Sequence, residues 1–559
     1  MKAILKSLLV VVLGITFVTS CIEEFDPQGR NKQISAEQAA NAPGAFDNFV
    51  NAITSTLVGT FPFGNNNNYP WDYGYPTFYL MRDYMGNDLP VSGDNNWYQT
   101  WYTCGSALGP QYLNCQIPWT YYYSWIKSCN TVLALAGEEP ETDKITGAGI
   151  AFAMRAMFYM DLAQMYAPKT YAVDRGAATV PVVKETTALE DLAYNPRATN
   201  EAMWAFILSD LDKAEAYLAG YTRSNVYTPD LSVVYGLKAR AYLVMADWAN
   251  AVTYAKLAQN GYSIMTKDQY TSRETGFNTP NSSWMLGVSF KPTDPNILLN
   301  DSDSSWASWM CIEVNPYVSG CGYASNYGQP PIIDRHLYET MPATDFRKNC
   351  FVDFALDALS EAECIKALEA YSDYPAWVYL TGHDSNYGAV GGLSLKFRLA
   401  GGQAGHDNQY VGFVVAVPMM RVEEMYLIEA EAAGMQNEGN GISLLTTFAQ
   451  TRDASFVYGT HTDAYGNTST SQFQNEVWWQ RRAEFWGEGL ATYDVKRLNK
   501  GIIRRYAGSN HPAPYRWNTT SPPDWMNFCI VQSETNYNFE CENNNIPIRP
   551  ATESEEYQW

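Results

Sequence analysis

The sequence predicts a mainly α-helical protein in which helical pairs stack into a solenoid-like scaffold, with long irregular loops and a few short strands. Two observations predict this fold class. Apolar residues recur at helical spacing in several long segments, and large apolar side chains alternate there with small ones such as alanine. Because small residues let a neighbouring helix come close, these segments are expected to pack in pairs. The pattern also leaves an irregular helical bundle open.

The N-terminus has the pattern of a signal peptide at residues 1–20. Lys2 and Lys6 precede an uncharged, mostly apolar run that is too short to span a bilayer. The residues leading to Cys21 resemble a bacterial lipobox, although the match is loose. We therefore expect cleavage before Cys21, several acyl chains on that cysteine, and one mature domain at 21–559. The alternative is ordinary signal cleavage with Cys21 in a disulfide.

Aromatic rings and amide side chains gather in the loop-like region at about 65–101. A ring that covers the C–H face of a pyranose removes apolar area from water, and amide or carboxylate groups hydrogen-bond its hydroxyls. The alternative is that these rings pin a long loop onto the helices. The region predicts a ligand-binding surface with the candidates Trp71, Tyr73, Tyr75, Arg82, Asn87, Asp88, Asn95, Trp97 and Tyr98.

Helical pairs are predicted at about 119–166 and 200–260. Within the first region, Ala153 and Ala156 lie between large apolar residues that recur at helical spacing. Helices of this length and pattern resemble tetratricopeptide repeats, in which each pair buries its apolar face against the next. The methionine and aromatic stripes are therefore interpreted as core.

A second aromatic loop region is predicted at about 281–338. Its rings lie among Asn, Ser and Gly, as expected for a long surface loop. Asp301 and Asp303 faintly match the start of a calcium loop, but the required glycine and closing glutamate are missing. No metal site is therefore expected.

The stretch at 418–497 is predicted to form a further helical pair whose strips mix apolar residues with charges. Pro418 is expected to open the first helix and Gly434 to close it, and the second helix starts at Glu476. A buried charge is costly unless it is paired, whereas a solvated helix face would carry only ordinary i, i+4 pairs. Pairing is expected for Arg421, Glu424, Glu431, Arg482, Glu484 and Asp494.

This last pair resembles the C-terminal signature of the SusD/RagB family, surface lipoproteins that capture nutrients, usually glycans, for a partner outer-membrane transporter. Arg421 followed by 424–432 matches the first motif, and 488–489 followed by 494–497 matches the second. Ala491 departs from the family, which commonly keeps an arginine there. This departure puts one internal ion pair in doubt.

The resemblance implies a SusD-like fold and a surface-exposed lipoprotein of the cell outer membrane, anchored through Cys21. It implies that the protein captures oligo- or polysaccharide and passes it to a SusC-like TonB-dependent transporter, with no catalysis and no cofactor. It also implies that the second loop region completes the binding surface, with the candidates Trp306, Tyr323 and Tyr327.

Composition and motifs narrow the function classes. The net charge of −22 argues against nucleic acid as the main partner. The 40 tyrosines and 17 tryptophans exceed the usual demand of a core, so part of them is expected on surfaces. The sequence contains no G-x-S-x-G, H-E-x-x-H or phosphate-loop motif. Two alternatives stay open, a surface glycoside hydrolase with two carboxylates in a cleft and a protein- or peptide-binding repeat scaffold.

Nine cysteines follow Cys21, and eight of them fall into neighbouring positions. An exported protein can keep disulfides, but spacing does not prove connectivity, and buried free thiols are the alternative. The candidate pairs are Cys104/Cys115, Cys311/Cys321, Cys350/Cys364 and Cys529/Cys541.

Overall fold

The computed structural model divides the chain into two compact units, Met1–Asn48 and Phe49–Trp559. The account below concerns the second unit; of the first, only its last residues are described, and they begin α3 (Ala45–Ser55). The expected signal peptide and Cys21 lie outside the described residues. The structure describes residues 44–61, 69–91, 96–298, 304–315, 322–326, 329–384, 387–461, 463–550 and 553–559.

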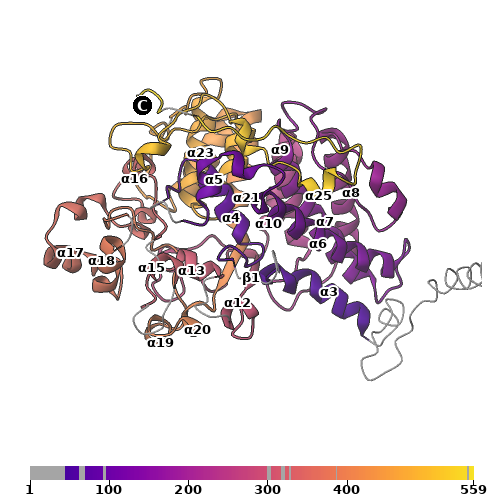
Figure 1. Ribbon diagram of the computed structural model, residues 1–559, viewed down its shortest axis with the longest axis horizontal. Coiled ribbons are helices and arrows are strands. Elements are labelled where there is room, and N and C mark those ends of the chain that lie inside the picture. Colours follow the sequence, from indigo (N-terminus) through magenta and orange to yellow (C-terminus); the bar gives the residue numbers. More distant parts are fainter. Residues whose placement is uncertain are drawn as a thin grey trace, which may run out of the picture. The chain divides into compact units, whose positions relative to one another are not determined.

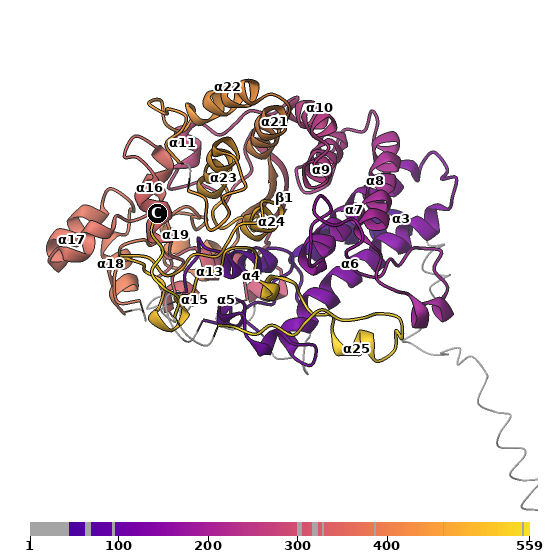
Figure 2. The same cartoon turned by 90° about the horizontal axis from the view of Figure 1, so that it is seen from above.

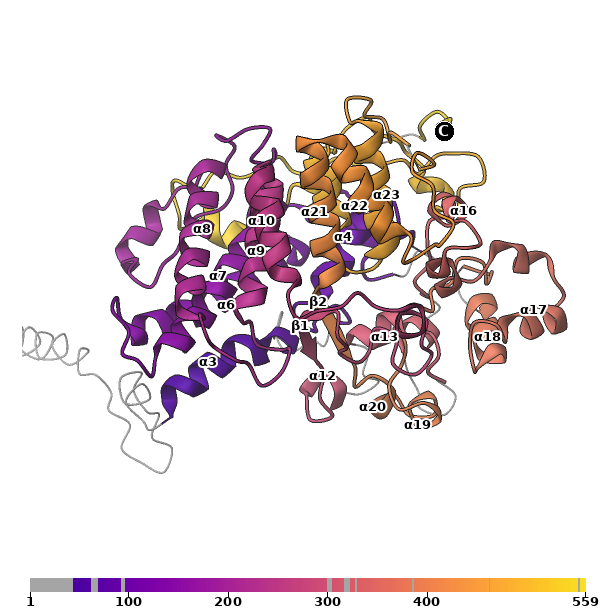
Figure 3. The ribbon, with the colours of Figure 1, turned by 180° about the vertical axis from the view of Figure 1, so that it is seen from behind.

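The expected mainly helical fold is confirmed, and its helices stack side by side in chain order (Figures 1 and 3). Each of the first four helices of the stack packs against the next one in the chain. The fifth then packs against the helix Val422–Gln436, which lies far along the chain. Within the described residues, no helix is both long and apolar enough to cross a bilayer. The stack consists of α6 (Leu113–Ala136), α7 (Ile145–Tyr166), α8 (Asn200–Tyr217), α9 (Leu231–Val244), α10 (Trp248–Gln259), α21 (Val422–Gln436) and α22 (Glu438–Ala449).

Local sequence sets where these helices begin. Thr199, Asp230 and Asp247 precede α8, α9 and α10, and each side chain accepts a hydrogen bond from a backbone N–H of the first turn. Such N-caps satisfy donors that have no partner within the helix. α7 is apolar nearly all round because it lies between α6 and α8.

The structure corrects the boundaries expected around Pro418. This residue lies in β2 (Ala416–Arg421), which pairs antiparallel with β1 (Trp284–Ser289), rather than at a helix start. Gly434 lies inside α21, where an added Cβ would be 2.1 Å from the ring of Phe473. Glycine therefore allows close packing of α21 against α23 (Gln472–Glu484) instead of ending the helix.

The helix expected from Glu476 to Arg497 is two helices. α23 ends at Glu484, and α24 (Ala491–Arg497) follows after a turn. Gly487 and Gly489 have φ values of 75° and 76° in this turn, a left-handed conformation that glycine adopts without strain. The short turn directs Glu488 back toward Arg421.

The charged residues of this region are buried and paired, as expected, and the solvated-face alternative is wrong. Glu484 accepts hydrogen bonds from Arg421 at 3.1 Å, Arg452 at 2.9 Å and Arg347 at 3.3 Å. Glu488 accepts from the Nε of Arg421 at 2.9 Å. The remaining pairs are Glu424 with Arg240, Glu431 with Arg497, Arg482 with Asp88, and Asp494 with Arg481 and Arg497.

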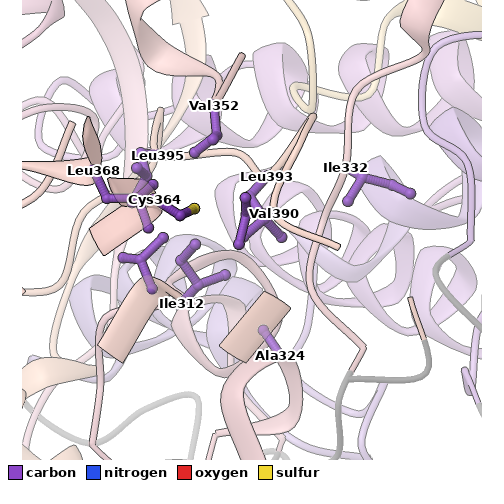
Figure 4. Close-up of a cluster of buried hydrophobic side chains, with 10 residues drawn as sticks. Ile312, Ala324, Ile332, Val352, Cys364, Leu368, Val390, Leu393 and Leu395 are labelled. Carbon is purple, nitrogen blue, oxygen red and sulfur yellow. The ribbon is translucent and has the colours of Figure 1, made fainter. Parts of the chain in front are cut away.

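A second apolar core lies outside the helical stack. α17 (Glu361–Leu368) and α18 (Pro375–Asp384) cover it, and single β-bridges such as Ile332 to Leu393 close it. Figure 4 shows its side chains pointing toward one another. Lys396 is buried and donates to Glu488. The second loop region leads into this core through α12 (Pro295–Leu298), α13 (Trp306–Met310), α15 (Tyr323–Asn326) and α16 (Arg335–Thr340).

The described cysteines are free and buried, so the disulfide interpretation is wrong for Cys104/Cys115, Cys350/Cys364 and Cys529/Cys541. Cys311 is also free, and Cys321 lies outside the described residues. The thiol of Cys115 donates instead to the backbone carbonyl of Cys529 at 3.0 Å. Burial raises the pKa of Cys104 to about 12, which makes its thiol unreactive at neutral pH.

Candidate functional site

The first loop region folds inward around α4 (Thr77–Met85), which is buried along its whole length. The hydroxyl of Tyr75 donates to Oδ2 of Asp161 on α7 at 2.6 Å. Arg82 donates through Nε to the carbonyl of Gly489 at 2.8 Å. Tyr75 therefore joins the segment before α4 to α7, Arg82 joins α4 to the turn before α24, and neither side chain faces solvent.

Asn87 and Asp88 also have structural partners. The amide oxygen of Asn87 accepts from the backbone N–H of Ile503 at 2.6 Å. Asp88 receives the Nε of Arg482 at 3.0 Å and, at its carbonyl, the Nε1 of Trp486 at 2.7 Å. Because these polar atoms are buried and occupied, a ligand would have to replace existing hydrogen bonds.

The rings of Trp71, Tyr73 and Tyr98 are buried as well. The hydroxyls of Tyr73 and Tyr98 hydrogen-bond each other at 2.6 Å, and Tyr98 also reaches Thr77 at 2.6 Å. Trp71 stacks on Tyr69 with centroids 4.6 Å apart. For these three rings the structure agrees with the alternative interpretation, in which they pin the loop onto the helices.

The candidates of the second loop region that the structure describes are also buried. Trp306 is buried edge-on against Phe397, with centroids 5.1 Å apart. Tyr323 is buried and stacks on Trp309 at 3.9 Å. Tyr327 lies outside the described residues, as does Asn95 of the first region.

The two loop regions contact each other. The Nε1 of Trp309 donates to the carbonyl of Pro70 at 2.8 Å, and Ser304 donates to the carbonyl of Tyr69 at 2.9 Å. Tyr98 packs edge-on against Trp309 with centroids 4.8 Å apart. Buried rings from both regions thus form one support beneath the loop surface.

Trp97 alone, among the candidates that the structure describes, presents its ring to solvent, with 44% of its surface exposed. The half-buried ring of Tyr69 lies edge-on to it, with centroids 6.0 Å apart. We call Tyr69 and Trp97 the aromatic platform. Sequence analysis missed Tyr69, although an aromatic residue directly after four consecutive asparagines, at 65–68 of the sequence, was the signal that could have found it. The platform offers a firm ring surface over a buried aromatic support.

The carboxylate of Asp83 on α4 lies beside position 491. Because residue 491 is alanine, it offers this carboxylate no guanidinium group. The carboxylate oxygens accept from the backbone N–H groups of Gly489 at 3.0 Å and Ala491 at 3.4 Å. Burial raises the pKa of Asp83 from 3.8 to about 7, although these hydrogen bonds and Arg82 oppose the increase. The folded protein therefore binds this proton more tightly than the unfolded chain does.

This difference predicts a pH-dependent effect of Asp83→Asn. The contribution of Asp83 to stability is complete below its unfolded pKa of 3.8 and is lost as the pH rises toward 7. The variant should therefore gain stability relative to the unmodified protein between about pH 4 and pH 7, by at most about 1.4 kcal/mol per pH unit. Urea unfolding at both pH values measures this, with exposed Asp143→Asn as the control for removing a negative charge. A constant difference between the Asp83 variant and the unmodified protein would contradict the raised pKa.

No group of His, Cys, Asp or Glu side chains that could hold a metal ion occurs among the described residues. Asp301 and Asp303, the faint calcium match, lie outside them.

Two family models match the chain. Residues 51–243 match a model described as "Starch-binding associating with outer membrane", and residues 369–556 match that of the SusD family. SusD-like protein P38 of Formosa agariphila is 22% identical over 411 residues, which cover 71% of this chain and 74% of that protein.

Solved structures share the fold. A SusD-like carbohydrate binding protein from Bacteroides vulgatus superposes with a TM-score of 0.67 at 21% identity, covering 89% of this chain and 97% of that one. Surface glycan-binding protein A from Bacteroides thetaiotaomicron, in complex with laminarihexaose, superposes with a TM-score of 0.62 at 16% identity, covering 89% and 98%. At these identities the similarity establishes the architecture.

Proposed function

Because this chain belongs to the SusD family, we propose that it is a cell-surface protein that captures oligo- or polysaccharide and passes it to a SusC-like TonB-dependent transporter. The family consists of binding proteins rather than enzymes, which supports the expectation of a non-catalytic role. The observation that carries the proposal is the aromatic platform, in which the exposed ring of Trp97 lies beside the half-buried ring of Tyr69 over buried aromatic rings.

The platform suits a sugar because of its chemistry and its rigidity. The ring of Trp97 can cover the C–H face of a pyranose, and Tyr69 adds a hydroxyl beside it. The buried stack of Trp71 on Tyr69 fixes the platform before a ligand arrives, which lowers the ordering cost of binding. The proposed ligand remains intact, since the role of these groups is contact rather than bond cleavage.

Anchoring at the membrane is the second part of the proposal. Residues 1–20 are removed as a signal peptide, and Cys21 carries the acyl chains that hold the protein at the outer membrane. The support comes from the sequence pattern and from the family model that names the outer membrane. Mass spectrometry of the mature N-terminus tests it, and an unmodified Cys21 would contradict it.

Trp97→Ala is expected to weaken glycan binding about tenfold, because it removes the exposed stacking surface. Affinity electrophoresis in gels containing laminarin or starch measures the retardation. Trp559→Ala is the control, since Trp559 has the same exposed fraction of 44%. Unchanged retardation of the Trp97 variant in every gel that retards the unmodified protein would remove the platform as the site. Release of new reducing ends from these glycans would contradict the non-catalytic role.

A further inference from the structure

Tyr69, the half-buried ring of the aromatic platform, stands at the first position of a tight turn. Its carbonyl accepts the backbone N–H of Asp72 at 2.9 Å, and Pro70 occupies the second position. Proline is favoured there because its ring presets the φ angle that such a turn needs. The turn therefore fixes the backbone of Tyr69 locally, and contacts with other segments decide where the turn itself lies.

Those contacts come from the second loop region. Ser304 donates to the carbonyl of Tyr69 at 2.9 Å, and the Nε1 of Trp309 donates to the carbonyl of Pro70 at 2.8 Å. One short segment, 304–309, thus holds two successive carbonyls of the turn. The side chains of Ser304 and Trp309 are buried, so any contribution that they make to ligand binding has to be indirect.

Trp309 also supports the other half of the platform. Tyr98, the residue directly after Trp97, packs edge-on against the Trp309 ring with centroids 4.8 Å apart. The hydroxyl of Tyr98 is in turn held by Tyr73 and Thr77, each at 2.6 Å. A single indole therefore contacts the chain next to each of the two platform rings.

The helix α13, which carries Trp309, is itself anchored in the core. Ser305 caps it by accepting a backbone N–H of its first turn at 3.2 Å. Trp306 of this helix packs edge-on against Phe397 and, with centroids 5.8 Å apart, against Tyr79 of α4. α13 lies beside α4 in two perpendicular views, although the two helices are far apart in the chain (Figures 1 and 2). A helix fixed to the core thus presents the Trp309 indole to the turn.

We propose that Trp309 and Ser304 are positioning residues of the glycan site. They hold Tyr69 and Trp97 in the arrangement that a sugar ring binds, and neither touches the sugar. The inference rests on the proposed function, because it concerns the same platform. A platform that is aligned only part of the time has an apparent affinity reduced by that fraction. Loss of a hydrogen bond to the turn should therefore weaken binding although no ligand contact is removed.

Trp309→Phe tests the inference, because phenylalanine keeps a ring in the core and removes the donor to Pro70. We expect binding in gels containing laminarin or starch to weaken about fivefold, the effect of losing one hydrogen bond. Ser304→Ala, which removes only a hydroxyl, should act in the same direction. Trp479→Phe is the control that should bind as the unmodified protein does. Its buried indole donates to Thr340 at 2.8 Å, and it lies on α23, outside both loop regions.

The same substitution in the Trp97→Ala background separates positioning from general destabilisation. If Trp309 acts through the platform, Trp309→Phe should lower the residual glycan binding of Trp97→Ala by much less than fivefold. A loss of folded protein would instead lower binding by the same factor in both backgrounds. Urea unfolding establishes that each variant is folded under the conditions of the gel.

Unchanged binding by Trp309→Phe, with Trp97→Ala weakened, would overturn the inference and leave the proposed function intact. If Trp309→Phe did not fold, Ser304→Ala would decide in the same way. An equal loss in Trp479→Phe, or an equal loss in the Trp97→Ala background, would also overturn the inference, because the effect would not act through the platform. Full binding by Trp97→Ala, or no binding by the unmodified protein, would overturn the glycan site and the inference together.

Discussion

Replacing Glu484 by glutamine is expected to lower the free energy of unfolding by about 3–5 kcal/mol, because it leaves buried guanidinium groups without their shared anion. Glu484 is fully buried and receives Arg421, Arg452 and Arg347. An amide is uncharged, so each of the three cations loses one of its carboxylate partners. The variant keeps the shape of the side chain, so the loss measures charge rather than packing.

The pH dependence of this loss has a definite sign. Burial alone would raise the pKa of Glu484, but Arg452, Arg421 and Arg347 outweigh it and hold the pKa below 4.5. The ionised form therefore stabilises the fold above the unfolded pKa of 4.5, and this contribution is lost as the pH falls. The difference in the free energy of unfolding between Glu484→Gln and the unmodified protein should therefore become smaller as the pH falls.

Urea unfolding at neutral pH and at about pH 4 measures both effects. Glu369→Gln is the matched control, because Glu369 forms an exposed ion pair with Lys366. Removal of an exposed pair is expected to cost less than about 1 kcal/mol. If the two substitutions destabilised the protein equally, the buried ion pairs of Glu484 would contribute no more to stability than an exposed pair does, which would contradict this prediction.

Replacing Trp71 by alanine is expected to destabilise the protein by about 3–5 kcal/mol, as for other buried tryptophans. Its ring is buried and stacks on Tyr69, so its loss leaves a cavity beneath the aromatic platform. Trp97→Ala, by contrast, removes an exposed ring and should leave the unfolding free energy within about 0.5 kcal/mol. The two tryptophans thus separate a structural contribution from a binding contribution.

Thermal and urea unfolding of both variants, with glycan retardation measured where each is folded, provides the comparison. Trp71→Phe should recover most of the stability, because a ring still fills the space. Unchanged stability of Trp71→Ala together with lost glycan binding would restore Trp71 to the ligand-binding surface and contradict its role as support.

The helical stack could be predicted because its signal is local. In α7, apolar residues at helical spacing with Ala153 and Ala156 between them require burial on both sides, whatever lies beside the helix. That Arg421 and Glu484 need partners followed equally from the cost of an unpaired buried charge, whereas the structure shows that they pair with each other. The boundaries did not follow, because Pro418 fits a strand as well as a helix start, and Gly434 fits a close contact as well as a helix end.

The candidate site was less predictable because composition does not show whether a side chain points into the core or toward solvent. Tyr73, Tyr98 and Trp97 have the same kind of neighbours in the chain, yet the first two hydrogen-bond each other inside and the third is exposed.

The sequence by itself determined the family, the stacked helices and the need of their charges for partners, because periodicity and charge act within one helix. Only the tertiary structure decided which rings are core and which are surface. An aromatic side chain gains from burial wherever space is available, and that space is created by contacts between segments distant in the chain.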